Sequence, residues 1–196
     1  NFEYEAARSA ADRFINLHPR HPHTSYAYYI KGLSSFTDDS GLFNRYFVSD
    51  LSKRDMGPAQ NSFDDLSEFL SRYPESKYAP HAKQRMIYLR NLMAKHEMYV
   101  ADFYMKRGAY LAALGRAKYV VEHIPNTPQT PFALSVLVEA YEKLDYQELR
   151  QSSLEVLKSN FPEFSIKVDA ATGKRSWVNV ISLGVFGDNG IPAPDA

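Results

Sequence analysis

The side chains best suited to metal chemistry are three histidines, His18, His21 and His23, which stand within six residues of one another. Imidazole nitrogens are common ligands of zinc and copper. Two of these histidines precede a proline, which favours an extended turn whose successive side chains point in different directions. The chain has no cysteine to complete a zinc site, and the nearest downstream carboxylate is that of Asp38. We therefore interpret the cluster as a turn between two helices and expect no metal site.

The remaining sequence contains no constellation of residues that indicates catalysis. His96 and Glu97 form half of the zinc-protease motif H-E-x-x-H, but Val100 occupies the position of the second histidine. No phosphate-binding loop, dinucleotide-binding glycine pattern or nucleophile elbow occurs. Acidic pairs such as Asp64-Asp65 are better explained as solvated helix faces than as acid–base pairs. We expect neither enzymatic activity nor a cofactor, and a metal-dependent hydrolase built on the histidines is the least favoured hypothesis.

The overall charge also limits the possible partners. Lysine and arginine number 23, as do aspartate and glutamate, so the formal net charge is zero. Nothing in this balance favours nucleic acid or an anionic membrane surface. No apolar run approaches the roughly 20 residues that a membrane-spanning helix needs, and we find no signal peptide. Because the first residues already have a helical pattern, we expect the sequence to begin part-way through a longer protein.

A repeated helix ending organises most of the chain. Four segments, RFINLHP, EFLSRYP, YVVEHIP and EVLKSNFP, end at Pro19, Pro74, Pro125 and Pro162. Proline disfavours helical geometry in the residue before it, so each proline marks the end of a helix. The intervals are 55, 51 and 37 residues, whereas tetratricopeptide repeats, which are helix-turn-helix units, have a period of about 34. We predict an irregular array of such repeats.

The predicted fold class is all-α, an α-solenoid of tetratricopeptide repeats with an inserted loop and a C-terminal tail. The predicted helices lie near 2–17, 24–37, 57–73, 79–92, 94–107, 109–123, 129–143 and 146–160. The array would cover 1–164: a partial repeat at 1–19, a repeat at 23–74 with an insertion at 37–56, a repeat with an extra helix at 78–125, and a repeat at 127–162. The tail, 165–196, is expected to be irregular. Its apolar core could dock on the last helices, bind a partner or lie at a membrane interface.

Candidate binding residues gather around one predicted turn. Gly108 is expected to end a helix in the left-handed conformation, and Asp145 takes the place of that glycine in the next unit. Basic side chains flank the Gly108 turn and could meet an acidic patch on a partner. They are Lys106, Arg107, Arg116 and Lys118, and Tyr110 lies beside them. In the insertion, Arg54 and Asp55 could form an internal ion pair or belong to a contact.

Several strings, in this order and spacing, resemble the BamD family, also called ComL or YfiO. They are DRFINLHPRHP (12–22), YIKGL (29–33), SKRD (52–55), RYPESKY (72–78) and YMKRGAY (104–110). The family consists of tetratricopeptide lipoproteins of the bacterial outer-membrane β-barrel assembly (BAM) machinery. The resemblance implies five repeats in a full-length protein. It also implies a lipidated N-terminal cysteine, upstream of this sequence, that anchors the protein on the periplasmic face of the outer membrane.

The resemblance also implies partners. Members of the family bind a periplasmic POTRA domain of the barrel protein BamA, other lipoproteins such as BamC, and unfolded outer-membrane proteins. An arginine shortly after the G-A-[YW] turn contacts an acidic residue of BamA, and Arg116 in LGRAKY matches it. The expected function is thus a non-enzymatic adaptor that assists folding and insertion of outer-membrane proteins. The alternative is another periplasmic repeat protein that binds peptidoglycan or a cell-wall enzyme.

Overall fold

The computed structural model describes residues 2–36, 51–162, 164–168 and 175–179. The helices are α1 (Phe2–Leu17), α2 (Thr24–Ser35), α3 (Gly57–Arg72), α4 (Ala79–Lys106), α5 (Tyr110–His123), α6 (Thr130–Lys143) and α7 (Gln147–Asn160), with a short 3₁₀ helix at Leu51–Lys53. Two strands, β1 (Phe164–Val168) and β2 (Arg175–Asn179), follow them. The all-α class is confirmed for the repeat region. None of the described helices is both long and apolar enough to cross a membrane.

The four prolines end their helices in the same way. Helices α1, α3, α5 and α7 each stop two residues before a proline. In each case the residue before the proline donates its backbone N–H to the carbonyl four residues earlier, as His18 does to Phe14 at 2.8 Å and Phe161 does to Leu157 at 2.8 Å. Proline has no N–H with which to continue this ladder. The predicted helix stops are therefore confirmed.

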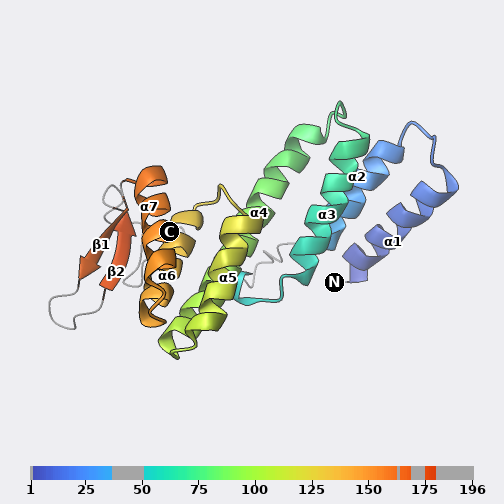
Figure 1. Cartoon of the computed structure of the whole chain (residues 1–196). Helices are drawn as coiled ribbons and strands as arrows, with labels where there is room; N and C mark the ends of the chain where they lie inside the picture. The colour runs from blue at the N-terminus through green and yellow to red at the C-terminus, as the bar shows by residue number, and fades with distance from the viewer. Residues whose placement is uncertain (1, 37–50, 163, 169–174, 180–196) are drawn as a thin grey trace. The chain divides into compact units, whose positions relative to one another are not determined.

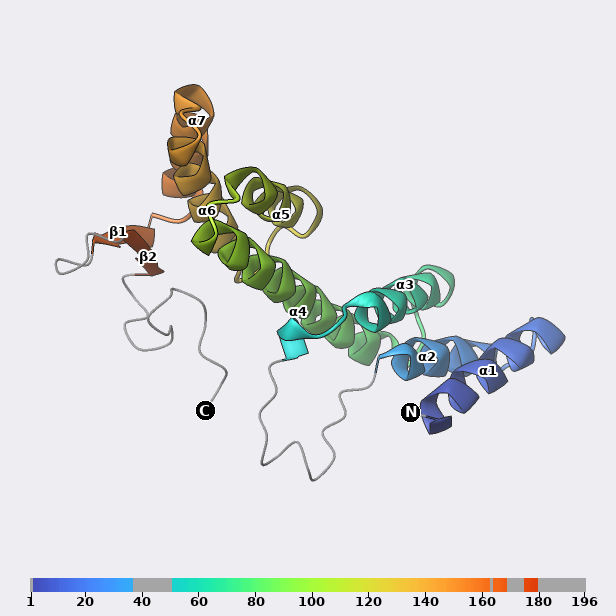
Figure 2. The same cartoon turned by 90° about the horizontal axis from the view of Figure 1, so that it is seen from below.

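The segment 79–106 is a single helix, whereas the sequence analysis predicts two helices there, at 79–92 and 94–107. Figures 1 and 2 show α4 without interruption. The prediction of a break is wrong because it rested on the repeat spacing alone. Between Pro80 and Gly108 the chain has neither proline nor glycine, so nothing in its backbone chemistry stops a helix.

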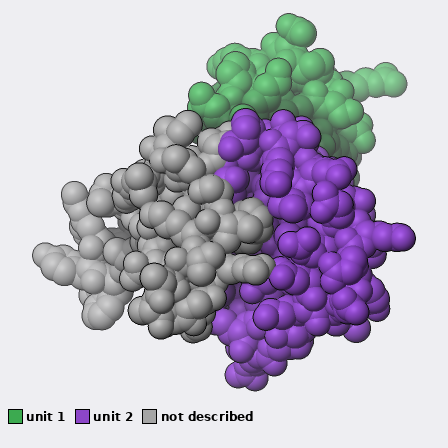
Figure 3. All heavy atoms as spheres, turned by 60° about the vertical axis from the view of Figure 1, so that its left-hand side comes forward, with its two compact units in different colours: residues 1–93 green, residues 94–196 purple. Residues whose placement is uncertain are grey.

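The chain divides into two compact units, residues 1–93 and 94–196 (Figure 3). The boundary falls within α4. In the first unit α2 packs against both α1 and α3. Leu66 and Phe69 of α3 are fully buried there, as is Leu89 of α4. The ring of Tyr29 stacks on that of Tyr78, with centroids 4.8 Å apart. The core of this unit is thus aliphatic and aromatic.

A partly buried ionic network also joins α1, α2 and α3, and the predicted solvated position of Asp65 is wrong, because its side chain is only 10% exposed. The carboxylate of Asp65 accepts hydrogen bonds from Arg8 at 2.7 Å and from the Ser35 hydroxyl at 2.8 Å. Lys31 lies 2.8 Å from the carboxylate of Asp12 and 3.5 Å from that of Asp65. Burial lowers the pKa of Lys31, but its hydrogen bond to Asp12 and the charge of Asp65 raise this pKa more, so the net shift is upward. One helix therefore cannot shift without separating opposite charges.

The second unit packs helices closely through small side chains. Helix α6 packs against both α5 and α7. Ala113 and Ala117 of α5 are fully buried, as are Ala133 and Ala140 of α6. Small residues at these positions let two helix backbones approach each other. The large side chains needed to fill the remaining space include Leu157 of α7, which is also fully buried.

Part of the predicted irregular tail is ordered as a β-hairpin. Strands β1 and β2 pair in antiparallel register, with Phe164 opposite Asn179 and Val168 opposite Arg175. The ring of Phe164 meets that of Phe132 in α6 edge to face at 4.9 Å, which fixes the start of β1 on the helices. The alternating sequence FSIKV has the pattern of a strand, which explains the departure from the prediction. Most of the predicted insertion (37–50) and the rest of the tail (169–174 and 180–196) lie outside the described residues.

Candidate partner-binding surface

The turn between α4 and α5 positions the candidate surface. Gly108 has φ of 72°, which confirms its predicted left-handed conformation. The N–H of Gly108 donates to the carbonyl of Met105 at 3.1 Å, and that of Ala109 to the carbonyl of Tyr104 at 3.0 Å. These two bonds form a Schellman motif, which satisfies the last carbonyls of α4. The ends of α4 and α5 are thus held in a fixed relation within the second unit.

Arg116 lies on α5 with 45% of its side chain exposed. Its Nη1 donates to a carboxylate oxygen of Glu97 in α4 at 3.2 Å, and the Glu97 side chain is only 15% exposed. A guanidinium group has five N–H donors in a planar fork. A single contact through one nitrogen orients this fork while leaving other donors available to a second carboxylate. Arg116 is therefore both positioned and accessible.

Two of the other predicted cations are paired on their own helices. Lys106 lies 2.7 Å from the carboxylate of Asp102, and Lys118 lies 3.5 Å from that of Glu122; both pairs are four residues apart. Such exposed pairs are weak and break easily. Lys118 and Arg116 are two residues apart on α5, so they lie on different sides of the helix. The structure does not bring all the predicted cations to one point.

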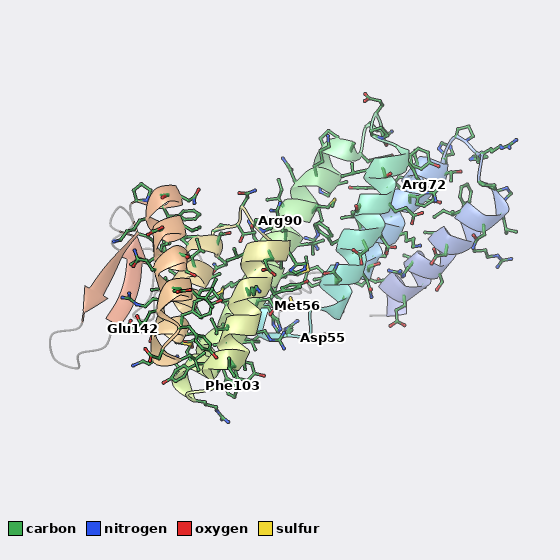
Figure 4. The ribbon with its side chains drawn as sticks, in the orientation of Figure 1. Asp55, Met56, Arg72, Arg90, Phe103 and Glu142 are labelled. Carbon is green, nitrogen blue, oxygen red and sulfur yellow. The ribbon has the colours of Figure 1, made fainter. Side chains whose placement is uncertain are left out.

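Arg107 has a different setting. Its guanidinium carbon lies 4.2 Å from the centre of the Phe103 ring, a cation–π contact. Phe103, labelled in Figure 4, is 44% exposed, and Leu111 at the start of α5 is 65% exposed. Tyr110 is half-buried and its hydroxyl lies 4.0 Å from where a Cβ would stand on Gly108. The surface near the turn is therefore apolar as well as basic.

Sequence reasoning missed three members of this surface. Phe103 and Leu111 could have been found from their places on the outer faces of α4 and α5, because a helical wheel separates them from the buried alanines. Glu97 gives no such signal. It lies 19 residues before Arg116, and only the packing of α5 on α4 brings the two together.

Arg54 and Asp55, the residues predicted for the insertion, belong to the first unit. A carboxylate oxygen of Asp55 accepts the backbone N–H of Gly57, the first residue of α3, at 3.0 Å. Figure 4 labels Asp55 beside Met56 at this helix start. An acidic group is favourable there because it satisfies a free N–H and faces the positive end of the helix. The Asp55 carboxylate thus binds the first N–H of α3, whose N-cap residue is Met56.

The histidines form a packed turn between α1 and α2. The rings of His21 and His23 have centroids 5.3 Å apart, and Phe14 contacts both His18 and His21. Nδ1 of His21 accepts the backbone N–H of His23 at 3.2 Å, so one of its nitrogens is used within the turn. Thr24 donates its hydroxyl to the carbonyl of His18 at 2.7 Å. Within the described part of the chain, no three histidine or acidic side chains are grouped as metal ligands.

Comparison with known proteins agrees with this architecture. Residues 1–157 match the family YfiO, described as an outer membrane lipoprotein. The chain is 40% identical over 161 residues to a Neisseria gonorrhoeae protein named outer membrane protein assembly factor BamD, which covers 82% of this chain. Proteins of the same name from Xylella fastidiosa (strain Temecula1) and Vibrio cholerae are 38% and 31% identical over 82% and 76% of the chain. These names describe an assembly factor and not an enzyme.

The matches cover only part of these relatives: 60%, 55% and 62% of the Neisseria, Xylella and Vibrio proteins. The family model, which matches residues 1–157, includes all the described helices almost to the end of α7 and excludes the β-hairpin. The predicted resemblance is confirmed, and the chain belongs to the YfiO family of outer membrane lipoproteins.

Proposed function

We propose that this chain is part of a non-enzymatic adaptor of the BAM machinery, held on the periplasmic face of the outer membrane by an N-terminal lipid anchor. Its direct partner in this proposal is a periplasmic POTRA domain of BamA. BamC and unfolded outer-membrane proteins are the further partners expected of such an adaptor. The relatives' names support a role in outer membrane protein assembly.

Arg116 is the residue on which the proposed contact with BamA depends most. Its guanidinium is half-exposed and is bound to Glu97 through one nitrogen only. An acidic side chain of the partner can therefore bind bidentately beside Glu97, as arginine geometry favours. Phe103 and Leu111 add exposed apolar area in the same unit, and desolvation around an ion pair strengthens it.

The test measures binding of purified BamA POTRA domains to this chain by calorimetry. Arg116→Glu is expected to weaken binding roughly 30-fold or more, since losing one member of a buried interfacial charge pair costs about 2–5 kcal/mol. The affinity of Arg116→Lys should lie between those of the wild type and Arg116→Glu, because lysine keeps the charge but lacks the planar fork of donors. Helicity should be retained, whereas Tm should fall, because the largely buried Glu97 loses its partner and faces a second carboxylate. Binding is therefore compared at a temperature at which each variant is folded.

Lys158→Glu is the matched control, because it makes the same change of charge at an exposed position of α7. It should bind like the wild type. If the wild type binds and Arg116→Glu binds equally well, the assignment of Arg116 is wrong while the adaptor function stands. If the wild type does not bind POTRA domains but sediments with peptidoglycan, the alternative function is supported instead.

A further inference from the structure

Helix α7, the last described helix (Figure 1), has an apolar side that the described residues leave exposed. Tyr146, at its N-cap, Leu149 and Val156 are 48%, 51% and 46% exposed. With Ser153 they are spaced by three, four and three residues, so all four lie along one side of the helix, which we call the outer face. Leu157, on the adjoining side, is fully buried. Among the described elements, only α6 packs extensively against α7.

The outer face differs from the remaining exposed surface of α7. Gln151, Glu155 and Lys158 lie on the opposite side of the helix, and all three are exposed. The outermost helix of a repeat array is normally polar on its free side, because no further helix stacks there. Large apolar side chains gathered on an exposed side mark a contact surface. The outer face has this character, whereas the opposite side has the polar character of a solvated surface.

The β-hairpin brings the following part of the chain back to α6 and α7. Phe164 lies four residues after the end of α7, is 7% exposed and contacts the ring of Phe132 in α6. In the register of the hairpin Phe164 is opposite Asn179, and opposite residues of antiparallel strands have Cα atoms about 5 Å apart. Residues 180–196 lie outside the described part of the chain. The register nevertheless requires this segment to begin beside the pair α6 and α7.

The sequence that follows β2 fits the outer face in composition and in length. Residues 180–186 have the sequence VISLGVF, which contains no charged side chain. Ile181, Leu183 and Val185 alternate with serine and glycine, a pattern typical of an extended segment with one apolar side. Seven extended residues span about 20 Å, and the outer face is about 15 Å long at the rise of an α-helix. The segment can therefore cover the whole outer face.

We propose that residues 180–186 dock in extended form on the outer face and cover α7. The segment reaches the outer face at Val156, which is nearer the hairpin, and runs antiparallel to α7 toward Tyr146. Because the hairpin tethers the segment, docking is intramolecular, with an effective concentration on the order of millimolar. Of the three locations that the sequence allows for this apolar segment, the proposal selects the last helices. It does not involve Arg116 or a POTRA domain.

The first test measures disulfide formation, which is specific because the chain has no cysteine. Ser153→Cys places a thiol in the middle of the outer face, and Lys158→Cys places one on the opposite side of α7 as the matched control. Each is combined in turn with Ile181→Cys, Leu183→Cys or Val185→Cys, so that the result does not depend on one register. Dilute protein is oxidised mildly, and intramolecular disulfides are quantified by mass spectrometry. With Ser153→Cys at least one pair should form roughly tenfold or more faster than with Lys158→Cys, since the tether alone favours neither side.

The second test measures whether the segment and the outer face stabilise each other. Removal of residues 180–196 should lower the urea midpoint, because the outer face returns to water. In Leu149→Lys, which places a charge on the outer face, the same removal should change the midpoint little, and this non-additivity reports the contact. Gln151→Lys adds the same charge on the opposite side, and in this control the removal should keep its full effect. Circular dichroism verifies folding of each variant, and the disulfide test decides alone where a variant does not fold.

Equal rates of disulfide formation on the two sides of α7 would overturn the proposal. So would an equal effect of the removal in the wild type and in Leu149→Lys. A disulfide between two chains that carry only Ser153→Cys, together with a dimer in sedimentation, would overturn it in favour of a second copy on the outer face. Neither test contains a POTRA domain, so this proposal and the assignment of Arg116 can fail independently.

Discussion

Three arginines show how a partner determines what a guanidinium can do. Arg72 lies 2.9 Å from Glu68 one turn earlier on its own helix, an exposed pair of little energetic weight. Arg116 is oriented by Glu97 from a neighbouring helix and remains half-exposed. Among the described residues, Arg85 of α4 contacts the backbone carbonyl of Phe36 and the rings of Phe36 and Tyr88. Because the charge is the same in all three, the difference in expected binding comes from the neighbouring groups.

Tyr29 makes the stability of the first unit sensitive to alkali. Burial raises the pKa of its phenol above the ordinary value of 10.0, and the nearby Tyr26 and Tyr78 raise it further. The unfolded chain therefore loses this proton at a lower pH than the folded chain does. Stability from this group is complete below about pH 10 and decreases as the pH rises above it. Lys31, whose pKa is also raised, acts in the same direction.

We expect the urea midpoint of the wild type to fall as the pH rises above 10.0. Tyr29→Phe should be less stable at neutral pH, because it loses the hydrogen bond to His81, but its midpoint should fall less steeply with pH. Tyr146→Phe, which alters a side chain that is 48% exposed, is the control and should follow the wild type. Identical slopes for wild type and Tyr29→Phe would contradict this account.

Individual site residues were predictable only where a local pattern marked them. Gly108 was predictable, because a glycine at the end of a helical pattern commonly adopts the left-handed conformation that ends the helix. Arg116 was proposed from its match to a family motif and not from charge spacing, and its role stays a prediction. Glu97 and Arg85 were not predictable, since their roles depend on contacts 19 and 49 residues distant in sequence.

At the scale of elements, two helices end with the same motif built on different residues. Asp145 has φ of 60°, and the N–H of Tyr146 donates to the carbonyl of Tyr141 at 2.9 Å, as Ala109 does to Tyr104. The prediction that Asp145 replaces the glycine of the turn is confirmed. A left-handed conformation costs a side-chain-bearing residue about 1 kcal/mol or more, which glycine avoids.

Gly108→Ala should destabilise the chain by about 1 kcal/mol, because alanine strains the left-handed turn. Asp145→Gly should stabilise the chain, because glycine adopts the left-handed conformation without strain. The gain should be smaller than the loss in Gly108→Ala, because the hydrogen bond from Gln147 to the aspartate is also lost. The control is Gly115→Ala, in the exposed middle of α5 with nothing near the added methyl group; it should stabilise by up to about 1 kcal/mol. The measurement is the urea midpoint. If Gly115→Ala lowers the midpoint as Gly108→Ala does, the explanation by left-handed strain is contradicted.

The elements were more predictable than the site. Proline and glycine act on their own backbone, so helix ends at Leu17, Arg72, His123 and Asn160 follow from local chemistry. The continuity of α4 could also have been inferred, because the sequence between Pro80 and Gly108 contains no proline or glycine to break a helix. Repeat spacing was a weaker guide, since the interval of 51 residues suggested three helices where the structure has two, α4 and α5.

At the scale of the whole molecule, the two units raise the question of whether they unfold together. Gly32 of α2 offers a specific way to perturb the first. A Cβ at this position would lie 2.6 Å from a methyl carbon of Leu66 and 3.2 Å from the backbone nitrogen of Leu66. Leu66 is fully buried, and the Gly32 carbonyl accepts the hydroxyl of Ser62 at 2.7 Å, so α2 and α3 cannot easily separate.

Gly32→Ala should therefore destabilise by roughly 1–3 kcal/mol, as overpacking of cores does, although alanine favours helices. In repeat arrays stability is the sum of each repeat and its nearest neighbours, so the effect should decrease with distance along the chain. Hydrogen exchange resolved by peptide should show α1 to α3 exchanging roughly 5- to 150-fold faster, with α6 and α7 unchanged. Equal acceleration in α6 and α7 would show instead that both units open as one, and α4, which crosses their boundary, would then be the element that couples them.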